Sequence, residues 1–332
     1  MNQIQKADFI DRVQAVTELY LTRRRRDKRV KKEKQKAKNV ILDWLGAFVW
    51  AAGVVLLINQ YLVQAYTIPS GSMINTLLIG DRIFVNKLIY GPELLPAMFK
   101  LPSPIKPQRN EVIIFENPSH ISRGTAFSIA QRIIYMLTLS MVDIDRDEFG
   151  EPRAQFLIKR AAGMGGDHFV LDKGDFLIRF SGENRWVRER DFNNGRNFNH
   201  EISRLMELNS YPPLASAGRA SAYNDLSFNH QINTSALNSQ LANIRFPDQL
   251  AYERARLEVL RASQPFNNRY GILLARHTQG WYIPEGRILT LGDNRDNSRD
   301  GRFYGPIEES KVLGKGFIIY WPLFGGRMGF IR

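Results

Sequence analysis

A serine and a lysine are the residues of this chain whose local sequence suits them best to chemistry. Ser72 lies in Pro-Ser-Gly-Ser-Met, where Pro69 fixes the backbone and Gly71 permits a tight bend that exposes the hydroxyl. Lys159 lies in Phe-Leu-Ile-Lys-Arg, among aliphatic residues that make a buried ammonium group costly. If burial lowers the pKa of this lysine by roughly 2–3 units, its neutral amine can take the proton of a serine that attacks a carbonyl. The two segments therefore predict a serine nucleophile with a lysine base.

Each of the two residues has a plainer interpretation when it is taken alone. The serine could be an ordinary turn residue, and the lysine could extend from a strand edge into water. A third segment, 291–305, is polar and could support the pair. Its Ser298 could hydrogen-bond the lysine amine, and Asp300 and Arg302 could form an ion pair that braces the loop.

The sequence gives little support to metal or cofactor chemistry. There is no cysteine, which excludes disulfides, thiolate metal sites and a cysteine nucleophile. The five histidines do not have the spacing of metal ligands. Segment 291–305 partly matches a calcium loop, but Ile307 occupies the position at which that loop needs glutamate. No phosphate loop or dinucleotide fingerprint is present, so we expect neither a metal nor a cofactor.

One long apolar run precedes the serine. The run Val40–Ile58 reads VILDWLGAFVWAAGVVLLI, which is close to the length of about 20 residues that a helix needs to span a bilayer. Its one acid, Asp43, would lie at the membrane interface, where a charge is tolerated. A cleavable signal peptide is the competing interpretation, but its apolar region is usually shorter and its basic region is not this long. We expect a retained transmembrane helix over 40–61.

The chain carries a net charge of +13, and +8 of it lies within residues 1–39. A basic tract such as 23–38 could bind nucleic acid. Its position beside the apolar run favours another role, because juxtamembrane Lys and Arg stay in the cytoplasm and attract anionic lipid. The sequence predicts contact with membrane lipid and no nucleic-acid partner. It places residues 1–39 in the cytoplasm and residues 62–332 outside the cell membrane.

A second apolar stretch, Thr125–Val142, is interrupted at mid-length by Gln131 and Arg132. An arginine at the centre of a bilayer is costly, so a second membrane span is not expected. The spacing of the apolar residues predicts a helix. That helix could pack in the core or lie on the membrane surface, and the sequence leaves both open.

The region after residue 61 shows mainly the signals of strands. Short runs rich in β-branched and aromatic residues are separated by Gly, Pro, Asp and Asn. Lys173-Gly174 is a candidate hairpin turn. These signals predict a mostly β fold, an antiparallel, barrel-like catalytic domain. The expected strands are 111–115, 156–159, 168–171, 175–180, 288–291 and 316–321.

Residues from about 182 to 270 differ from the rest, because they are rich in Asn, Ser and Arg. The clearest helix candidate among them is Gln249–Ala262. We interpret this region as a variable insertion between core strands, and no residue in it shows recognisable chemistry.

Several of these segments together resemble the type I signal peptidases, which are membrane-bound leader peptidases. The resemblance includes the basic segment and the membrane anchor. The order of the matching segments along the chain, and the distances between them in sequence, fit that family. The segments after the anchor are IPSGSM at 68–73, EVIIF at 111–115, FLIKRAAGMGGD at 156–167 and GDNRDNSRDGR at 292–302.

The resemblance implies roles for particular residues on a mostly β fold. Ser72 would be the nucleophile and Lys159 the general base. Ser70 would donate its hydroxyl to the oxyanion hole, and Ser298 would orient the lysine. Supporting the scaffold would be Arg160, Asp293, Asp300 and Arg302, and the pockets for small residues would be lined by Ile68, Pro69, Met73, Leu77 and Ile158.

Two positions depart from the pattern of the family. Members usually have proline three residues after the nucleophile, and this chain has Asn75. The usual Gly-x-Pro-Gly-Asp that follows the lysine reads Gly-Met-Gly-Gly-Asp, with Gly165 in place of proline. Loss of a proline loosens the local backbone but removes no reacting group.

The resemblance thus implies a monomeric, membrane-anchored serine endopeptidase that removes signal peptides from exported preproteins after small residues. A protein of the same fold that binds apolar peptides without cleaving them is the alternative.

Overall fold

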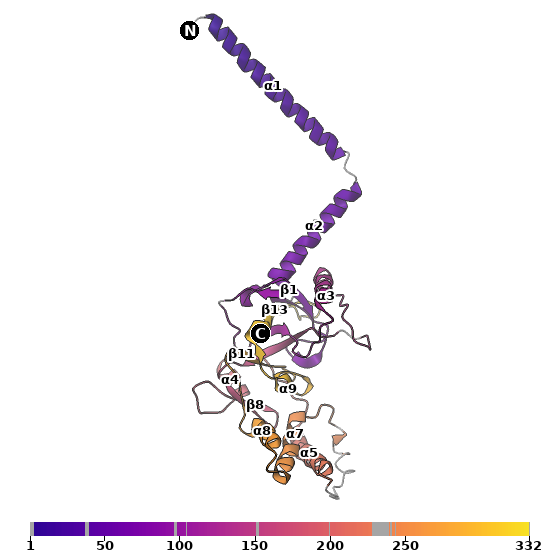
Figure 1. Cartoon of the computed structure of the whole chain (residues 1–332), viewed down its shortest axis with the longest axis vertical. Helices are drawn as coiled ribbons and strands as arrows, with labels where there is room; N and C mark the ends of the chain where they lie inside the picture. The colour runs from indigo at the N-terminus through magenta and orange to yellow at the C-terminus, as the bar shows by residue number, and fades with distance from the viewer. Residues whose placement is uncertain are drawn as a thin grey trace. The chain divides into compact units, whose positions relative to one another are not determined.

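The computed structural model describes residues 3–36, 40–95, 98–103, 105–150, 153–198, 200–227, 239, 241–242 and 244–331. The chain forms two compact units, Met1–Val55 and Leu56–Arg332. The first unit contains α1 (Gln3–Lys36) and most of α2 (Val40–Tyr61), as Figure 1 shows. The junction between the expected basic segment and the expected membrane helix, 37–39, lies outside the described residues.

Helix α2 contains the predicted apolar run and extends three residues beyond it. Within the described residues it is the one helix that is long and apolar enough to cross a membrane, over Leu42–Tyr61. Hardly any of this span is buried, and Trp44, Phe48 and Trp50 are exposed. A helix that is apolar on all sides and uncovered by protein is suited to a lipid environment.

The second unit is built on a curled antiparallel sheet in the order β1-β2-β13-β5-β6-β11-β12, with β14 beside β13. The prediction of a mostly β, antiparallel fold is confirmed. Each expected strand that belongs to this sheet is present. Its strands are β1 (Val63–Thr67), β2 (Arg82–Asn86), β5 (Val112–Glu116), β6 (Phe156–Gly163), β11 (Arg287–Leu291), β12 (Ile307–Glu308), β13 (Val312–Trp321) and β14 (Gly329–Phe330).

Among the edges of this sheet that have no neighbouring strand in the described part of the chain are those of β1 and of the first half of β6. Strand β1 pairs with β2 alone. Residues Phe156–Lys159 of β6 pair with β5 on one side, while β11 joins the other side only from Arg160 onward. An extended peptide could therefore hydrogen-bond to either edge.

A second sheet has the order β10-β7-β8-β9. Strands β7 and β8 form the predicted hairpin, in which Asp172 pairs with Asp175. The connecting Lys173 and Gly174 both have positive φ, 45° and 76°, as a tight two-residue hairpin turn requires. The bounds are β7 (His168–Asp172), β8 (Asp175–Arg179), β9 (Val187–Arg188) and β10 (Trp281–Tyr282), while β3 (Glu93–Leu95) and β4 (Met98–Lys100) form a separate pair.

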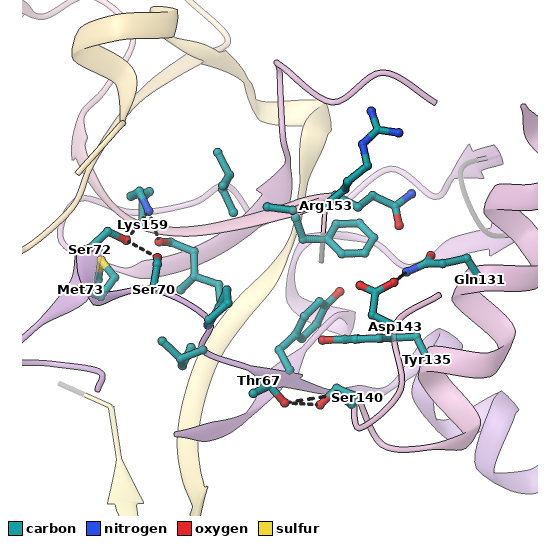
Figure 2. A pocket seen from close by; sticks show the side chains of 18 of the residues that line it. Thr67, Ser70, Ser72, Met73, Gln131, Tyr135, Ser140, Asp143, Arg153 and Lys159 are labelled. Atoms are coloured by element: carbon teal, nitrogen blue, oxygen red, sulfur yellow. Dashed lines mark hydrogen bonds between the residues drawn. The ribbon is translucent and has the colours of Figure 1, made fainter. Parts of the chain in front are cut away.

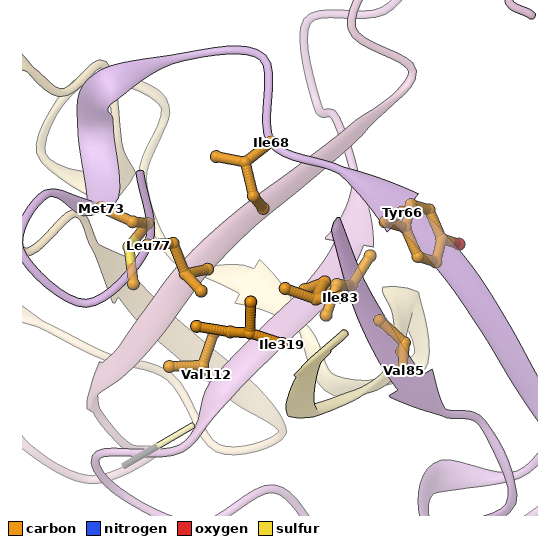
Figure 3. Close-up of a cluster of buried hydrophobic side chains, with 9 residues drawn as sticks. Tyr66, Ile68, Met73, Leu77, Ile83, Val85, Val112 and Ile319 are labelled. Carbon is orange, nitrogen blue, oxygen red and sulfur yellow. The ribbon is translucent and has the colours of Figure 1, made fainter. Parts of the chain in front are cut away.

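One hydrophobic cluster fixes the segment that carries the serine (Figure 3). Met73 and Leu77, on either side of the bend after Ser72, pack against side chains from β1, β2, β5 and β13. The cluster comprises Tyr66, Ile68, Met73, Leu77, Ile83, Val85, Val112, Ile114 and Ile319.

The insertion contains more helix than the sequence predicts. Its expected helix is confirmed as α7 (Gln249–Ser263). The described residues of the insertion also form α4 (Glu189–Gly195) and α5 (Tyr211–Asp225), and α8 (Asn268–Thr278) begins at its end. Helices α5, α7 and α8 pack together (Figure 1). A Cβ atom at Gly218 of α5 would lie 2.3 Å from the carbonyl oxygen of Tyr252, so the close packing of α5 on α7 requires glycine. Residues 228–238, 240 and 243 of this region lie outside the described residues.

Helix α3 (Thr125–Leu137) occupies most of the second apolar stretch. Gln131 and Arg132, the polar interruption of that stretch, are buried. Arg132 forms ion pairs of 2.7 Å with Glu93 and 3.4 Å with Glu116. The polar residues therefore attach α3 to the second unit, while Ile133 and Leu137 stay exposed. Short helical turns complete the unit at α9 (Gly301–Tyr304), η1 (Gly71–Met73), η2 (Leu88–Tyr90), η3 (Leu208–Ser210), η4 (Arg295–Asn297) and η5 (Glu309–Lys311).

Candidate active site

The structure brings Ser72 and Lys159 into direct contact. Ser72 lies in the single turn η1, and the Nζ atom of Lys159 is 2.6 Å from Ser72 Oγ. Figure 2 shows the two side chains meeting at one end of a cavity. Only 7% of Ser72 and 4% of Lys159 is exposed, so the contact is largely shielded from bulk water.

The strand register explains why this lysine is buried. Lys159 pairs with Ile113 of β5, a residue with no exposed surface. Its amine has two hydrogen-bond partners, Ser72 Oγ and the Ile158 carbonyl oxygen at 3.0 Å. Burial lowers the pKa of Lys159 to about 8, and the negative charges of Asp300 and Asp293 limit the fall. A substantial fraction of the amine is therefore neutral at slightly alkaline pH.

The backbone around the serine is held by a residue that the sequence analysis did not single out. Asn294 donates its backbone N–H to the Ser72 carbonyl at 3.1 Å and its side-chain amide to the Gly71 carbonyl at 3.0 Å. Gly292 allows this approach, because a Cβ atom there would lie 2.5 Å from the Ser72 carbonyl oxygen. The signal for Asn294 was its place inside the polar segment that carries the resemblance.

Ser70 lies beside the nucleophile. Its Oγ donates to Ser72 Oγ at 3.4 Å, a long contact, and its side chain is exposed to the cavity. The hydroxyl can rotate towards an oxygen that develops negative charge next to Ser72.

A buried ion pair fixes the strand that carries Lys159. Arg160 binds Asp293 through two nitrogens, at 2.9 and 2.7 Å, and both side chains are almost completely buried. Thr76 donates a further hydrogen bond to Asp293 at 2.5 Å. Burial favours the neutral carboxyl of Asp293, but Arg160 and Thr76 outweigh it and lower its pKa.

The expected pair of Asp300 and Arg302 is also present. Arg302 binds both carboxylate oxygens of Asp300, at 2.8 and 3.0 Å, and Asp300 accepts the Gly292 N–H at 2.9 Å. Burial opposes ionisation of Asp300, but Arg302 keeps its pKa below the ordinary value. Through Gly292 this pair fixes the start of the polar loop 291–305, whose Asn294 binds the Ser72 carbonyl.

Ser298 lies near the pair but does not contact the lysine amine in this structure. Its Oγ is buried and makes no hydrogen bond of normal geometry within the described residues. It is close enough to Asp300 to help lower the pKa of that carboxyl. The expected hydrogen bond from Ser298 to Lys159 is therefore not formed here.

The cavity beside Ser72 has a volume of about 490 Å³. Of the residues expected to form the small-residue pockets, Ile68, Pro69, Met73 and Ile158 line it. Leu77 is not among the lining residues, because it is fully buried in the cluster of Figure 3. The cavity extends past these residues to side chains from α3 and from the loop that follows it, which the sequence analysis assigned no role.

The insertion makes buried contacts to the polar loop 291–305, and no sequence pattern indicated these contacts. Arg295 of this loop forms an ion pair with Glu189 of α4, at 2.6 and 2.9 Å. Arg204 binds Asp296 at 2.8 Å. Both pairs join charges about a hundred residues apart, and nothing in either local sequence indicates its partner.

Asn75, which replaces the usual proline, also contacts the insertion. Its side-chain amide donates to the Glu201 carboxylate at 2.8 Å and to Ser203 Oγ at 3.0 Å. Ser203 in turn donates its N–H to the Asp293 carbonyl at 2.8 Å. These hydrogen bonds restrain the turn after Ser72. In relatives with proline at this position, the proline ring restrains the same turn.

The chain was compared with protein families and with curated proteins. The family described as "Signal peptidase, peptidase S26" matches residues 41–215 and 222–321. This match includes most of the insertion, although no motif there carried the resemblance. The protein named signal peptidase I from Haemophilus influenzae is 25% identical over 282 residues, which cover 85% of this chain and 70% of that protein. The proteins of the same name from Aquifex aeolicus and Pseudomonas fluorescens are 26% and 24% identical, over 80% and 87% of this chain and 79% and 76% of their own lengths. The chain therefore belongs to the signal peptidase family, peptidase S26.

Proposed function

We propose that this protein is a membrane-anchored endopeptidase that removes signal peptides from exported preproteins through Ser72 and Lys159. The observation that carries the proposal is the 2.6 Å contact between a buried lysine amine and a serine hydroxyl at the end of a cavity. The relatives named signal peptidase I support the reaction, and the geometry supports the roles of the two residues.

The first half of the reaction would form an acyl-enzyme. Neutral Lys159 takes the proton of Ser72 while Oγ attacks the carbonyl carbon of the scissile bond. Ser70 and the backbone N–H of Ser72 stabilise the resulting oxyanion. The protonated lysine then gives its proton to the leaving amine, which is the new N-terminus of the mature protein.

The second half would release the signal peptide. Water attacks the acyl group and loses its proton to the same lysine, which is neutral again after the first step. The tetrahedral intermediate then collapses, Ser72 recovers its proton from the lysine, and the upstream product leaves with a free carboxylate. No cofactor or metal is required for either step.

The substrate would bind as an extended strand between the free edges of β1 and β6. These edges offer backbone hydrogen bonds that do not depend on sequence, so selectivity must come from side-chain pockets. Ile68, Met73 and Ile158 narrow the cavity beside Ser72. We therefore propose that small residues are required next to the cleaved bond, as in an A-x-A site.

The anchor would place this reaction at the membrane surface. We propose that α2 spans the bilayer, with residues 1–39 in the cytoplasm and residues 62–332, including the insertion at about 182–270, on the outer face. Eleven residues lie between Gln60 and Ser72, so the twelve backbone steps reach at most roughly 43 Å. The nucleophile thus stays near the bilayer that holds the apolar part of a signal peptide, which raises the effective concentration of the substrate. All proposed site residues come from one chain, so a monomer suffices.

The direct test is cleavage of a preprotein in detergent by the full chain and by Ser72→Ala. We expect the wild type to release a mature protein whose mapped N-terminus follows an A-x-A site, and we expect no cleavage by the variant. Binding of the preprotein without cleavage by the wild type would instead support the alternative, a silent peptide-binding protein.

Ser70→Ala in the same assay tests the oxyanion donor. Loss of one such donor costs about 10²–10³ in kcat, and the KM for the preprotein should change little. A decrease in kcat of less than threefold would remove Ser70 from this role.

The pH dependence follows from the pKa of the base. Because the reaction needs the neutral amine and the pKa of Lys159 is about 8, kcat/KM should rise about tenfold per pH unit below that value and level off above it. A profile between pH 5 and 10 checks this. A rate that is constant across pH 6–9 would contradict a lysine base.

A further inference from the structure

The cavity beside Ser72 continues well beyond the pockets for small residues. In Figure 2, Ser72, Met73 and Lys159 lie at one end, and Gln131, Tyr135 and Asp143 lie at the other. We call this other end the far chamber. Among the residues that line it are Gln131, Tyr135, Asp143, Arg146, Arg153 and Gln155.

Aromatic side chains connect the two ends of the cavity. The Tyr66 ring meets Phe156 edge-on with centroids 5.7 Å apart, and it lies 6.1 Å from Tyr135. The Arg132 guanidinium lies 5.0 Å from the Phe156 ring and is itself paired with Glu93. These contacts fix the walls, so the far chamber is a formed part of the site.

In the described part of the chain, two fully buried side-chain atoms of the far chamber have no hydrogen-bond partner, and both are amide oxygens. Gln131 is 3% exposed, and its Nε2 donates to Asp143 Oδ1 at 2.9 Å. The opposite amide orientation would place two oxygens together, so Oε1 must be the atom that lacks a donor. Gln155 Oε1 also has none, and in the described part of the chain no donor reaches Asp143 Oδ2. A complementary ligand must supply hydrogen-bond donors.

The strands identify the substrate residue that would reach this chamber. Ile68 and Ile158 line the cavity near Ser72, and Tyr66 and Phe156 lie two residues earlier on β1 and β6. Side chains of an extended peptide alternate, so the first, third and fifth residues before the cleaved bond face the same wall. In the proposed reaction the upstream part of the substrate stays attached to Ser72 as the acyl group, and we place it in the cavity that begins at this residue. The fifth residue then faces the far chamber.

We propose that the far chamber is a substrate subsite for the fifth residue before the cleaved bond, and that it prefers a neutral side chain with N–H donors, best met by glutamine. The inference rests on the proposed function. A glutamate would bring a second carboxylate, with no hydrogen to donate, next to Asp143 and the two amide oxygens, and Arg153 is already paired with Asp145 at 3.6 Å. A lysine would meet the positive charges of Arg146 and Arg153, which line the same chamber. A leucine would leave the acceptors unpaired.

The test uses preproteins that differ only at the fifth residue, with Gln, Leu or Glu, and the full chain in detergent. We expect the wild type to cleave the Gln substrate with a kcat/KM about tenfold above that of the Leu substrate. The Glu substrate should be cleaved more slowly than the Gln substrate. Asp143→Asn keeps the acceptor Oδ1 but replaces Oδ2 with a donor, so the Gln-to-Glu ratio should fall at least about tenfold.

The matched control is Glu148→Gln, which removes the same charge from an exposed residue on the same loop that does not line the cavity. It should keep the wild-type ratios. Ratios between substrates do not depend on how much of a variant folds. Equal kcat/KM values of the wild type for Gln and Leu would overturn the inference without any variant, and so would an unchanged Gln-to-Glu ratio in Asp143→Asn. If the wild type cleaves none of the three, the proposed function fails as well.

Discussion

Replacing Lys159 by methionine is expected to lower kcat for preprotein cleavage by at least about 10³-fold. The thioether side chain has a similar length but accepts no proton, and the structure offers no second base near the nucleophile. The described groups within hydrogen-bond reach of Ser72 Oγ are Lys159 Nζ and Ser70 Oγ, and a hydroxyl cannot serve as a base near neutral pH. The measurement is single-turnover cleavage of a preprotein at pH 9, where the wild-type amine is mostly neutral.

The loss in this variant should not come from unfolding. Burial disfavours the charged form of Lys159, so removal of the amine should leave the denaturation midpoint in detergent unchanged or higher. Lys106→Met is the matched control, because Lys106 is exposed and its ion pair with Glu309 is a surface contact of 3.4 Å. It should cleave like the wild type. Cleavage by Lys159→Met within tenfold of the wild-type rate would show that another group is the base.

The sequence was sufficient to predict the contact between Ser72 and Lys159 and most of the sheet. Pro69 and Gly71 constrain the backbone at Ser72, and the aliphatic residues next to Lys159 indicate that its side chain is buried. Both signals come from residues close in sequence. The hairpin at Lys173-Gly174 and helix α7 were predictable for the same reason, because turn residues and helical spacing act over a few positions.

The features that were not predicted depend on contacts between distant parts of the chain. Helix α5 shows little helical periodicity of apolar residues, and its fit against α7 depends on the small Gly218. Ser298 was expected to contact Lys159, but the path of the loop brings Asn294 to the backbone of the nucleophile. Leu77 was expected in a pocket and packs in the core. These contacts depend on distances between residues far apart in the chain, and a single sequence does not contain those distances.

The insertion is the clearest example of this limit. Its composition suggested a variable elaboration without chemistry, whereas the structure shows it bound to the polar loop 291–305 through Glu189, Arg204 and Ser203. Because the loop in turn holds the Ser72 carbonyl through Asn294, the insertion contributes to the position of the nucleophile.

Glu189→Ala should therefore lower the free energy of unfolding of the second unit by about 3–5 kcal/mol. Only 2% of the Arg295 side chain is exposed, and Glu189 is the carboxylate that binds both of its terminal nitrogens. Burial disfavours the charge of Arg295, while Glu189 favours it strongly enough to raise the pKa of the guanidinium. Without Glu189 the guanidinium would stay charged, buried and without its main counter-charge. The midpoint of thermal unfolding in detergent should fall by about 10 °C.

A double variant distinguishes the loss of the ion pair from the cost of a buried charge that has lost its partner. Glu189→Leu combined with Arg295→Met removes both charges and keeps apolar volume, so it should recover most of the stability lost in Glu189→Ala. Glu183→Ala, in an exposed position of the same segment, is the control and should change the midpoint little.

If the ion pair positions the polar loop 291–305, the double variant will be stable but slower. Its kcat should fall while its KM stays nearly unchanged, because the Ser72 backbone loses an anchor and the cavity walls remain. Equal destabilisation of the single and double variants would mean that the buried charge is not the cause, and the insertion would then stabilise the loop through its backbone contacts alone.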